Sequence, residues 1–331
     1  MKDLGRRSNL EENMDRIVVI TVTFNDYDYL EKSLSALRKQ TIPIEKIVVV
    51  DNCSSEENRQ KLQLQQNEQI DVLWLSENKG GAGGFEEGMR YAQERYAPDW
   101  YWLMDADAYP KEDCAEKLLA HKAYCDDIGI LAPLIYGTDL REYQLYHHKR
   151  MSRFLYRDIQ MYHSHEEIPD VSFIEADAFV GPMISKRAVE DVGIANGGLF
   201  IYGDDVEYTY RVYQKYKVLL VRAAVMMHRD QPVNGAQNPN NWWKDYYIFR
   251  NRVLFIKQYN KSMFDRMAGL CLLNLRLVKQ LMLTYRMPYS KAMKKMRRKL
   301  LIQGINDGIR GMSGKTVDPL VFREKIKQLE E

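Results

Sequence analysis

The sequence predicts an α/β fold in which helices flank a central sheet, followed by a basic and mostly helical C-terminal region. β-branched runs at 16–24 and 47–50 enclose a helical segment, and a third run follows at 70–75. Strand, helix and strand within about 35 residues form a βαβ unit, which implies parallel strands and a right-handed crossover. Helical and apolar segments continue to alternate after this unit, and the last third of the chain is rich in Lys and Arg.

The composition is typical of a folded protein. Of the 331 residues, 45% are hydrophobic and 28% are charged, and the formal net charge is only +2. The four cysteines lack C-x-x-C spacing, which argues against a zinc site or a disulfide framework and suits a reducing compartment. The polar N-terminus shows no signal-peptide core, and no segment reaches about 18 uninterrupted apolar residues. We therefore expect a cytoplasmic protein with a flexible lead-in over residues 1–15.

Polar residues follow each of the first three predicted strands. Thr23 and Asn25 close the first strand, Asp51 closes the second, and Asn78 follows the third. Open α/β sheets bind ligands at the carboxyl ends of their strands. We therefore expect these four side chains to line one ligand crevice.

A glycine cluster, ENKGGAGGF, follows the third strand and precedes a helix predicted at 85–96. We predict a loop at 80–84 that lets a ligand approach the backbone closely, with a helix N-terminus behind it that can face an anion. The cluster matches neither G-x-G-x-x-G nor the P-loop pattern, and its place after the third strand counts against a Rossmann dehydrogenase. An ordinary flexible loop is the alternative.

Two aspartates end the aromatic run WYWLMDADAYP. Residues 101–104 suit a buried strand, and side chains alternate along a strand, so Asp105 and Asp107 would point the same way. Neighbouring carboxylates repel unless a cation lies between them, and Mg²⁺ or Mn²⁺ bridging to substrate phosphates is the natural occupant. A solvated loop is the alternative, because the tripeptide Asp-x-Asp is common.

A second acidic centre lies in the sequence GGLFIYGDDVEY at 197–208. Aspartates before a helix can be N-caps, but that accounts for only one of Asp204, Asp205 and Glu207. A carboxylate here could act as a general base and take a proton from an incoming hydroxyl. Farther along, His228 ends an apolar segment, where it is either structural or a third ligand for Mn²⁺.

Two further stretches are rich in aromatic residues and histidines. Residues 137–170 show no clear period, and we interpret them as an irregular insertion whose histidines lie at the surface rather than bind a ligand. These histidines are His147, His148, His163 and His165. Trp242 and Trp243 open the second stretch, and aromatic faces of this kind can stack on sugar rings. Core packing in an amphipathic helix is the alternative for the aromatic residues after them.

The C-terminal third is strongly basic. Between 246 and 303 the chain holds fourteen Lys and Arg residues and a single acid, Asp265, with Leu and Met between them. Basic amphipathic helices of this kind suggest docking on anionic lipid. A solvated basic face and a helical oligomer interface are the alternatives. We do not expect a nucleic-acid partner, because no recognised binding motif accompanies the charge.

Four motifs together resemble those of inverting nucleotide-sugar glycosyltransferases of family 2, which have the GT-A fold. They are VVITVTFND with IVVVDNCSS, then ENKGGAGGF, then WLMDADAYP, and finally LFIYGDDVEY followed by MMHRD. They spread over residues 16–230. ENKGGAGGF and GDDVEY most closely resemble galactofuranosyltransferases, and bacterial rhamnosyltransferases are the next group. Galactofuranosyltransferases often have three consecutive aspartates where this chain has Asp105-Ala106-Asp107.

The resemblance implies a Rossmann-like mixed sheet flanked by helices in a catalytic domain at 16–240, with a helical region at 241–331 for acceptor or membrane association or oligomerisation. It implies Mn²⁺ or Mg²⁺ bound by Asp105, Asp107 and His228, a catalytic base at Asp205, and acceptor binding by Asp204. We expect Trp242 and Trp243 to add to the acceptor site. The residues implied or expected to contact the nucleotide are Thr23, Asn25, Asp51, Asn78, Gly80, Gly81 and Asp105. Residues 304–315 resemble the closing loop of many members of this family, and a polar helix should end the chain.

We therefore expect a glycosyltransferase that uses a UDP-sugar, or a dTDP-sugar, and a glycan or lipid-linked glycan acceptor of the bacterial surface. Its expected location is the inner face of the cell membrane, as a peripheral protein and a possible homo-oligomer. A nucleotidyltransferase also joins a metal site to an α/β sheet, and a non-catalytic sugar- or lipid-binding scaffold is the third alternative. The acidic motif GDDVEY favours the glycosyltransferase.

Overall fold

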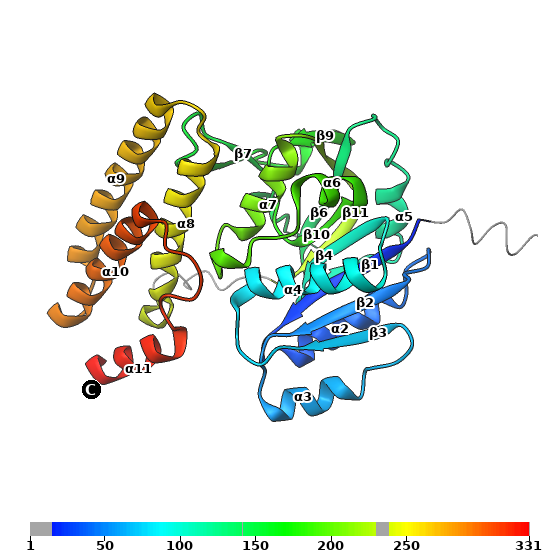
Figure 1. Cartoon of the computed structure of the whole chain (residues 1–331), viewed down its shortest axis with the longest axis horizontal. Coiled ribbons are helices and arrows are strands. Elements are labelled where there is room, and N and C mark those ends of the chain that lie inside the picture. Colours follow the sequence, from blue (N-terminus) through cyan, green and yellow to red (C-terminus); the bar gives the residue numbers. More distant parts are fainter. Residues whose placement is uncertain (1–14, 141, 230–237, 331) are drawn as a thin grey trace, which may run out of the picture.

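The computed structural model describes residues 15–140, 142–229 and 238–330. Figure 1 shows a sheet with helices on both faces and, beside it, a separate group of helices formed by the C-terminal third. The predicted lead-in lies outside the described residues except for Asp15. The division at residue 240 into two domains stays a prediction.

Within the described residues the main sheet has nine strands, and a two-stranded ribbon lies outside it. The strands of the main sheet are β1 (Ile17–Thr23), β2 (Lys46–Asp51), β3 (Ile70–Trp74), β4 (Trp100–Asp105), β5 (Ala108–Pro110), β6 (Ile128–Gly137), β9 (Val171–Ile174), β10 (Val180–Ser185) and β11 (Lys217–His228). The ribbon is β7 (Lys149–Met151) with β8 (Asp158–Gln160).

The helices around the sheet are α2 (Tyr27–Leu37), α3 (Glu56–Gln63), α4 (Gly80–Arg95), α5 (Cys114–Leu119), α6 (Lys186–Val192) and α7 (Asp204–Tyr213). The C-terminal helices are α8 (Trp243–Tyr259), α9 (Met263–Arg286), α10 (Lys291–Arg310) and α11 (Pro319–Glu330). Short 3₁₀ turns occur at η1 (Leu145–His147), η2 (His165–Glu167), η3 (Gly197–Leu199) and η5 (Pro239–Asn241). The predicted α/β class is therefore confirmed.

The order of the sheet brings the predicted site residues to one edge. Strands run in the order β3-β2-β1-β4-β10-β6-β11-β5, and β9 also pairs with β11. The first four strands in this order are parallel to one another. The next strand, β10, is antiparallel to β4, so the sheet is mixed. In this register Thr23 lies opposite Asp51, and Val22 lies opposite Asp105. The carboxyl ends of β1, β2 and β4 therefore meet at the same edge.

Two apolar cores lie on opposite faces of the sheet, because successive strand residues point to opposite faces. Val19 and Val49 pack toward α2, α3 and α5, whereas Ile20 and Val50 pack toward α4, α6 and α7. The β-branched runs are thus buried on both faces, as is usual for strands covered by helices on each side.

The glycine cluster is the start of a helix, which corrects the predicted loop at 80–84. Helix α4 begins at Gly80 and extends to Arg95. Two of its glycines permit close packing on the sheet. A Cβ atom at Gly84 would lie 2.4 Å from Val22, and one at Gly88 would lie 2.5 Å from Ile20. The sequence pattern suggested a loop because glycine is a poor helix former, but close contact between helix and sheet determines the structure here.

The segment before β9 also differs from the prediction. It contains η1, the β7–β8 ribbon and η2, and two of its four histidines are not at the surface. His147 and His148 are buried, whereas His163 is exposed and His165 is partly exposed. Both buried imidazoles have polar partners, so a polar residue type did not imply exposure here.

The C-terminal helices form two apolar clusters, and each includes a buried residue from earlier in the chain, Leu155 in one and Phe200 in the other. Helix α10 continues through Gly304 and Gly308, so the closing loop predicted at 304–315 is wrong for most of its length. Both glycines lie where α10 crosses α8, and a Cβ atom at Gly304 would lie 2.6 Å from the backbone oxygen of Tyr246. The predicted final helix is confirmed as α11.

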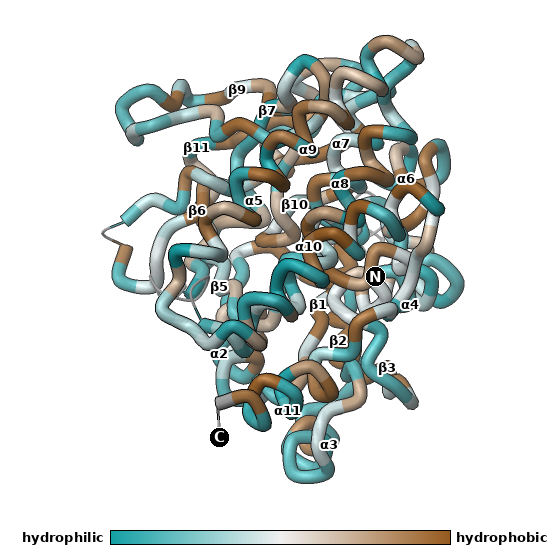
Figure 2. The backbone as a smooth tube through the Cα atoms, turned by 90° about the vertical axis from the view of Figure 1, so that its left-hand side faces the viewer, coloured by the Kyte–Doolittle hydropathy of each residue, from teal (hydrophilic) through white to brown (hydrophobic). Residues whose placement is uncertain are grey.

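Helix α9 is long and apolar enough, by length and composition alone, to cross a membrane. Only 22% of its most apolar 18-residue stretch is buried. Figure 2 looks onto this side of the molecule and shows hydrophobic residues along α9. The sequence-based expectation of no clear spanning segment therefore needs this one qualification.

We expect Gly80→Ala to lower the free energy of unfolding by about 3 kcal/mol, measured by urea denaturation. Gly80 has a φ of +72°, and a Cβ atom there would lie 2.0 Å from the carbonyl oxygen of Phe200. Gly311 has a similar φ of +77° but open space around it, so Gly311→Ala should cost only about 1 kcal/mol. Equal losses for the two variants would contradict the steric explanation.

Candidate functional site

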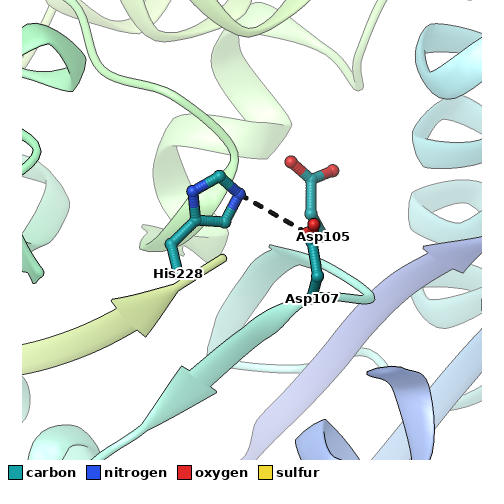
Figure 3. A group of neighbouring side chains, drawn as sticks. All are labelled: Asp105, Asp107 and His228. Carbon is teal, nitrogen blue, oxygen red and sulfur yellow. Dashed lines mark ion pairs between the residues drawn. The ribbon is translucent and has the colours of Figure 1, made fainter. Parts of the chain in front are cut away.

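Three potential metal ligands converge at the carboxyl edge of the sheet. Asp105 ends β4, Asp107 lies in the turn after it, and His228 ends β11. One ligand atom from each lies within 4.8 Å of the other two (Figure 3). The two carboxylates therefore lie close enough to share one cation, as the Asp-x-Asp spacing predicts, although Asp107 lies in a turn rather than on the strand. Two hard oxygens and one imidazole nitrogen are ligands that suit Mn²⁺.

The charges in this group perturb one another. Burial raises the pKa of Asp105 to about 7, and the Asp107 carboxylate contributes to the rise. Burial also raises the pKa of Asp107, but the interaction with His228 outweighs it and leaves this pKa below its usual value. Nε2 of His228 lies 3.4 Å from Oδ1 of Asp107, and Nε of Arg229 lies 3.8 Å from its other oxygen. Neighbouring negative charge therefore adds to burial in disfavouring the charged form of Asp105.

The predicted nucleotide-binding residues of the first two strands lie together. Thr23 and Asp51 are buried and face each other across β1 and β2. Asp51 pairs with Arg59 at 2.7 Å and accepts a hydrogen bond from the backbone of Ser54. The side-chain oxygen of Asn25 accepts a hydrogen bond from the backbone nitrogen of Ser55 at 2.7 Å. These contacts connect the loops after β1 and β2 at the carboxyl edge of the sheet.

Asn78 and its neighbours organise the start of α4. The side-chain oxygen of Asn78 accepts a hydrogen bond from the backbone nitrogen of Gly80, and the Phe200 carbonyl accepts one from Ala82. Two of the first amides of α4 are therefore already engaged. A Cβ atom at Gly81 would lie 3.9 Å from a carboxylate oxygen of Asp204. This helix N-terminus thus has a carboxylate beside it already, and contact of Gly80 and Gly81 with a nucleotide stays a prediction.

Asp204 and Asp205 occupy the first turn of α7 but differ in accessibility. Asp204 is buried, and burial together with Asp205 raises its pKa well above the usual value. Asp205 is partly exposed, and one of its oxygens accepts a hydrogen bond from the backbone nitrogen of Val206 at 2.7 Å. Burial raises the pKa of Asp205 despite the opposing charge of Lys149. Of the two carboxylates, Asp205 is the more accessible to a substrate hydroxyl.

Alternation along β4 directs Asp105 toward α7. Trp102 and Met104 pack in the core under α2 and α5, whereas Tyr101 and Leu103 pack in the core under α4 and α7. Asp105, which continues the second series, therefore belongs to the face of the sheet that carries Asp204 and Asp205. The charge of Asp205 accordingly contributes to the raised pKa of Asp105.

Trp242 and Trp243 do not form the expected acceptor wall. Their exposed fractions are 1% and 5%, and both belong to the apolar cluster of the C-terminal helices. Trp242 packs edge-on against Tyr289, with ring centroids 5.1 Å apart. Neither indole offers an open face on which a sugar could stack. Their position at the start of an aromatic helix is explained by core packing.

Residues that the sequence pattern did not single out hold the loop before α7. Arg250 is fully buried and donates hydrogen bonds to the carbonyl oxygens of Leu199 and Gly314. The side-chain nitrogen of Asn251 donates to the carbonyls of Leu199, Ile201 and Tyr202. Among a run of basic residues, nothing marked Arg250 as structural. These contacts position the segment that leads directly into Asp204.

Two buried amides were also missed. The Asn52 side chain donates to the carbonyl of Gly80 at 2.9 Å and accepts from the backbone nitrogen of Lys79 at 2.8 Å. The Gln144 side chain contacts His228 at two points. Asn52 lies next to Asp51 in the quoted motif, which could have drawn attention to it, whereas Gln144 lies in a stretch without a recognisable pattern.

Residues 18–180 match the model of glycosyl transferase family 2. The galactofuranosyltransferase GlfT1 of Mycolicibacterium smegmatis is 26% identical over 262 residues, which cover 73% of this chain and 83% of the relative. The GlfT1 of Mycobacterium tuberculosis is 28% identical over 265 residues, which cover 74% of this chain and 83% of the relative. Relatedness to galactofuranosyltransferases, expected from the motifs, is thus confirmed.

Among solved structures, S. aureus TarS 1–349 in complex with UDP-GlcNAc aligns with a TM-score of 0.56 at 15% identity, covering 90% of this chain and 81% of TarS. This similarity shows the GT-A fold. The family match, the galactofuranosyltransferase relatives and the shared fold identify the chain as a family 2 glycosyltransferase.

Proposed function

We propose that the chain transfers galactofuranose, with inversion, from a nucleotide-sugar donor to a growing bacterial surface glycan and requires a divalent cation. The observation that carries this proposal is the meeting of Asp105, Asp107 and His228 on the sheet face that also bears Asp205. The GlfT1 relatives support the sugar. TarS bound to UDP-GlcNAc supports a nucleotide-sugar donor.

The residues present at this site are suitable ligands for a divalent cation. A mannosyltransferase of Pyrobaculum calidifontis with the same fold was solved with GDP-Man and Mn²⁺, at a TM-score of 0.51 and 14% identity, covering 89% of this chain and 87% of that one. In this chain Asp105, Asp107 and Nε2 of His228 would hold Mn²⁺ or Mg²⁺. When bound, the cation would offset the charge that develops on the leaving diphosphate.

Asp205 is the proposed base. Its carboxylate takes the proton of an acceptor hydroxyl, and the hydroxyl oxygen forms a bond to the anomeric carbon. The bond from that carbon to the diphosphate breaks on the opposite side, so a single displacement inverts the anomeric configuration. A raised pKa makes Asp205 a better proton acceptor, and its partial exposure lets a hydroxyl reach it.

A rhamnosyltransferase that uses dTDP-rhamnose is the second candidate, because the motifs also resemble that group. Membership of family 2 favours sugar transfer over the nucleotidyltransferase and scaffold alternatives. A screen of UDP- and dTDP-sugars with Mn²⁺, measuring release of nucleoside diphosphate, decides between the two sugars. Release of pyrophosphate would instead indicate nucleotidyl transfer.

We further propose that α9 docks on the anionic inner surface of the cell membrane, where a lipid-linked acceptor would be available. One face of α9 carries apolar side chains at spacings of three and four residues that point to solvent. This stripe, called the α9 stripe, consists of Phe264, Met267, Cys271, Leu275, Val278, Met282 and Tyr285. Phe264 is 71% exposed and Leu275 is 66% exposed.

Charge complementarity favours an anionic lipid surface as the occupant of the α9 stripe. Arg276, Lys279 and Arg286 are exposed and adjoin members of the stripe in sequence. Apolar side chains flanked by cations are the pattern of helices that lie at the interface of anionic membranes. Some basic residues of the C-terminal third cannot face the membrane, because Arg250 and Arg297 are buried.

We expect Asp205→Asn to lower kcat about 10²–10⁴-fold while donor binding, measured by calorimetry, stays unchanged, because the amide cannot accept the proton. Asp126→Asn, at an exposed position, is the matched control. Asp204→Asn separates the two neighbours. If that variant lost turnover and Asp205→Asn retained it, the roles of the two carboxylates would be reversed.

We expect Asp107→Ala to reduce Mn²⁺ affinity by more than the roughly 10–100-fold that loss of an outer-shell partner costs. The variant removes a direct ligand. Calorimetric titration of Mn²⁺ with and without UDP measures the effect. Asp113→Ala, at a half-exposed carboxylate paired with Lys117, is the control. Unchanged Mn²⁺ affinity in Asp107→Ala would rule out the metal site.

We expect the double variant Leu275→Glu and Val278→Glu to bind phosphatidylglycerol-containing vesicles at least about tenfold more weakly in flotation assays. The variant places charge on apolar side chains that would enter the membrane on docking. Leu320→Glu with Val321→Glu changes exposed apolar residues on α11 and is the matched control. Pure phosphatidylcholine vesicles should bind less. If the unmodified protein dimerises through the stripe and ignores both vesicle types, a second copy is the occupant and the membrane proposal fails.

A further inference from the structure

Gln144 clamps the imidazole of His228 at two points. Its exposed fraction is 3%, and it lies directly before η1. The side-chain nitrogen of Gln144 donates a hydrogen bond to the backbone carbonyl of His228 at 3.1 Å. Its side-chain oxygen accepts a hydrogen bond from Nδ1 of the same residue at 2.8 Å. Both atoms of one amide therefore hold the backbone and the ring of one histidine.

This geometry fixes which ring nitrogen carries the proton. A backbone carbonyl can only accept, so the amide nitrogen of Gln144 must face it and the amide oxygen must face the ring. That oxygen can only accept, so Nδ1 of His228 must carry a hydrogen. In the neutral imidazole the lone pair is then on Nε2, the nitrogen that lies 3.4 Å from Asp107. The lone pair thus belongs to the side of the ring that faces the proposed cation.

The surroundings hold Gln144 itself in place. The hydroxyl of Tyr146 and Nε2 of His147 each lie 3.1 Å from the Gln144 side-chain oxygen. The His147 ring packs edge-on against His228, with centroids 5.4 Å apart. The backbone nitrogen of Gln144 donates to Ile135 in β6, the strand beside the His228 end of β11. The clamp therefore extends from a structured part of the sheet.

We propose that Gln144 is a positioning residue that sets the tautomer and direction of His228 for binding the divalent cation, an inference that rests on the proposed metal site. Metal-bound histidines generally donate their other ring N–H to a partner of this kind, and loss of the partner costs about 10–100-fold in metal affinity. Imidazole suits Mn²⁺ better than Mg²⁺, which prefers oxygen ligands and water. Gln144 therefore also determines how strongly the site prefers Mn²⁺ over Mg²⁺.

The test compares Gln144→Leu, Gln144→Glu and Gln40→Leu by calorimetric titration with Mn²⁺ and with Mg²⁺, each with and without UDP. Gln144→Leu should lose about 10–100-fold in Mn²⁺ affinity and less in Mg²⁺ affinity. The ratio of Mn²⁺ affinity to Mg²⁺ affinity should therefore fall. Gln144→Glu loses the donor to the His228 carbonyl but keeps an oxygen that accepts from Nδ1, so it should retain more of the Mn²⁺ affinity than Gln144→Leu. Gln40 also bonds backbone groups through both amide atoms, so Gln40→Leu controls for structural loss.

A double-mutant cycle with His228→Ala separates positioning from stability. If Gln144 acts through His228, Gln144→Leu should cause no further loss of Mn²⁺ affinity once the imidazole is gone. Additive losses would overturn the inference, as would normal Mn²⁺ affinity in Gln144→Leu. Equal losses in the Leu and Glu variants would also overturn it, and the Glu variant remains informative if the Leu variant does not fold. If the unmodified protein binds no Mn²⁺, or Asp107→Ala binds it normally, the metal site itself fails.

Discussion

The gathering of carboxylates at one edge of the sheet is the constraint on which the site depends. Burial raises the pKa of Asp105, Asp204 and Asp205, and repulsion from neighbouring aspartates of the group adds to the rise at Asp105 and Asp204. Such an arrangement is unfavourable unless the fold holds it and a cation compensates it. The β1–β4 register holds the first pair, and the first turn of α7 holds the second. The proposed cation would relieve this repulsion.

The C-terminal helices are part of this arrangement rather than an appendage. Arg250 and Asn251 of α8 bind the carbonyls of the segment that leads into Asp204. Phe200, in the same segment, accepts a hydrogen bond from the first turn of α4 and packs against Tyr247. A buried guanidinium with several carbonyl partners is costly to disturb. The position of the acidic pair therefore depends on residues about 50 positions later in the chain.

The strands and the Asp105–Asp107 pair could be predicted because both follow from local rules, β-branched runs and alternation along a strand. The glycine cluster, the two tryptophans and residues 304–315 were misjudged for one shared reason. In each case the residue type is compatible both with an exposed position and with a close packing contact. Only the tertiary neighbours determine which of the two the chain adopts. Gln144 could not be found at all, because its role comes from a partner 84 residues away.

Alternation also explains the departure from three consecutive aspartates. Trp102, Met104 and Ala106 all belong to the core under α2 and α5, and Ala106 is 7% exposed. The middle position of Asp105-Ala106-Asp107 thus points away from the face that carries the acidic pair of α7. A carboxylate there would be directed into an apolar core, where an unpaired charge is costly. Alanine therefore removes no ligand from the proposed cation site.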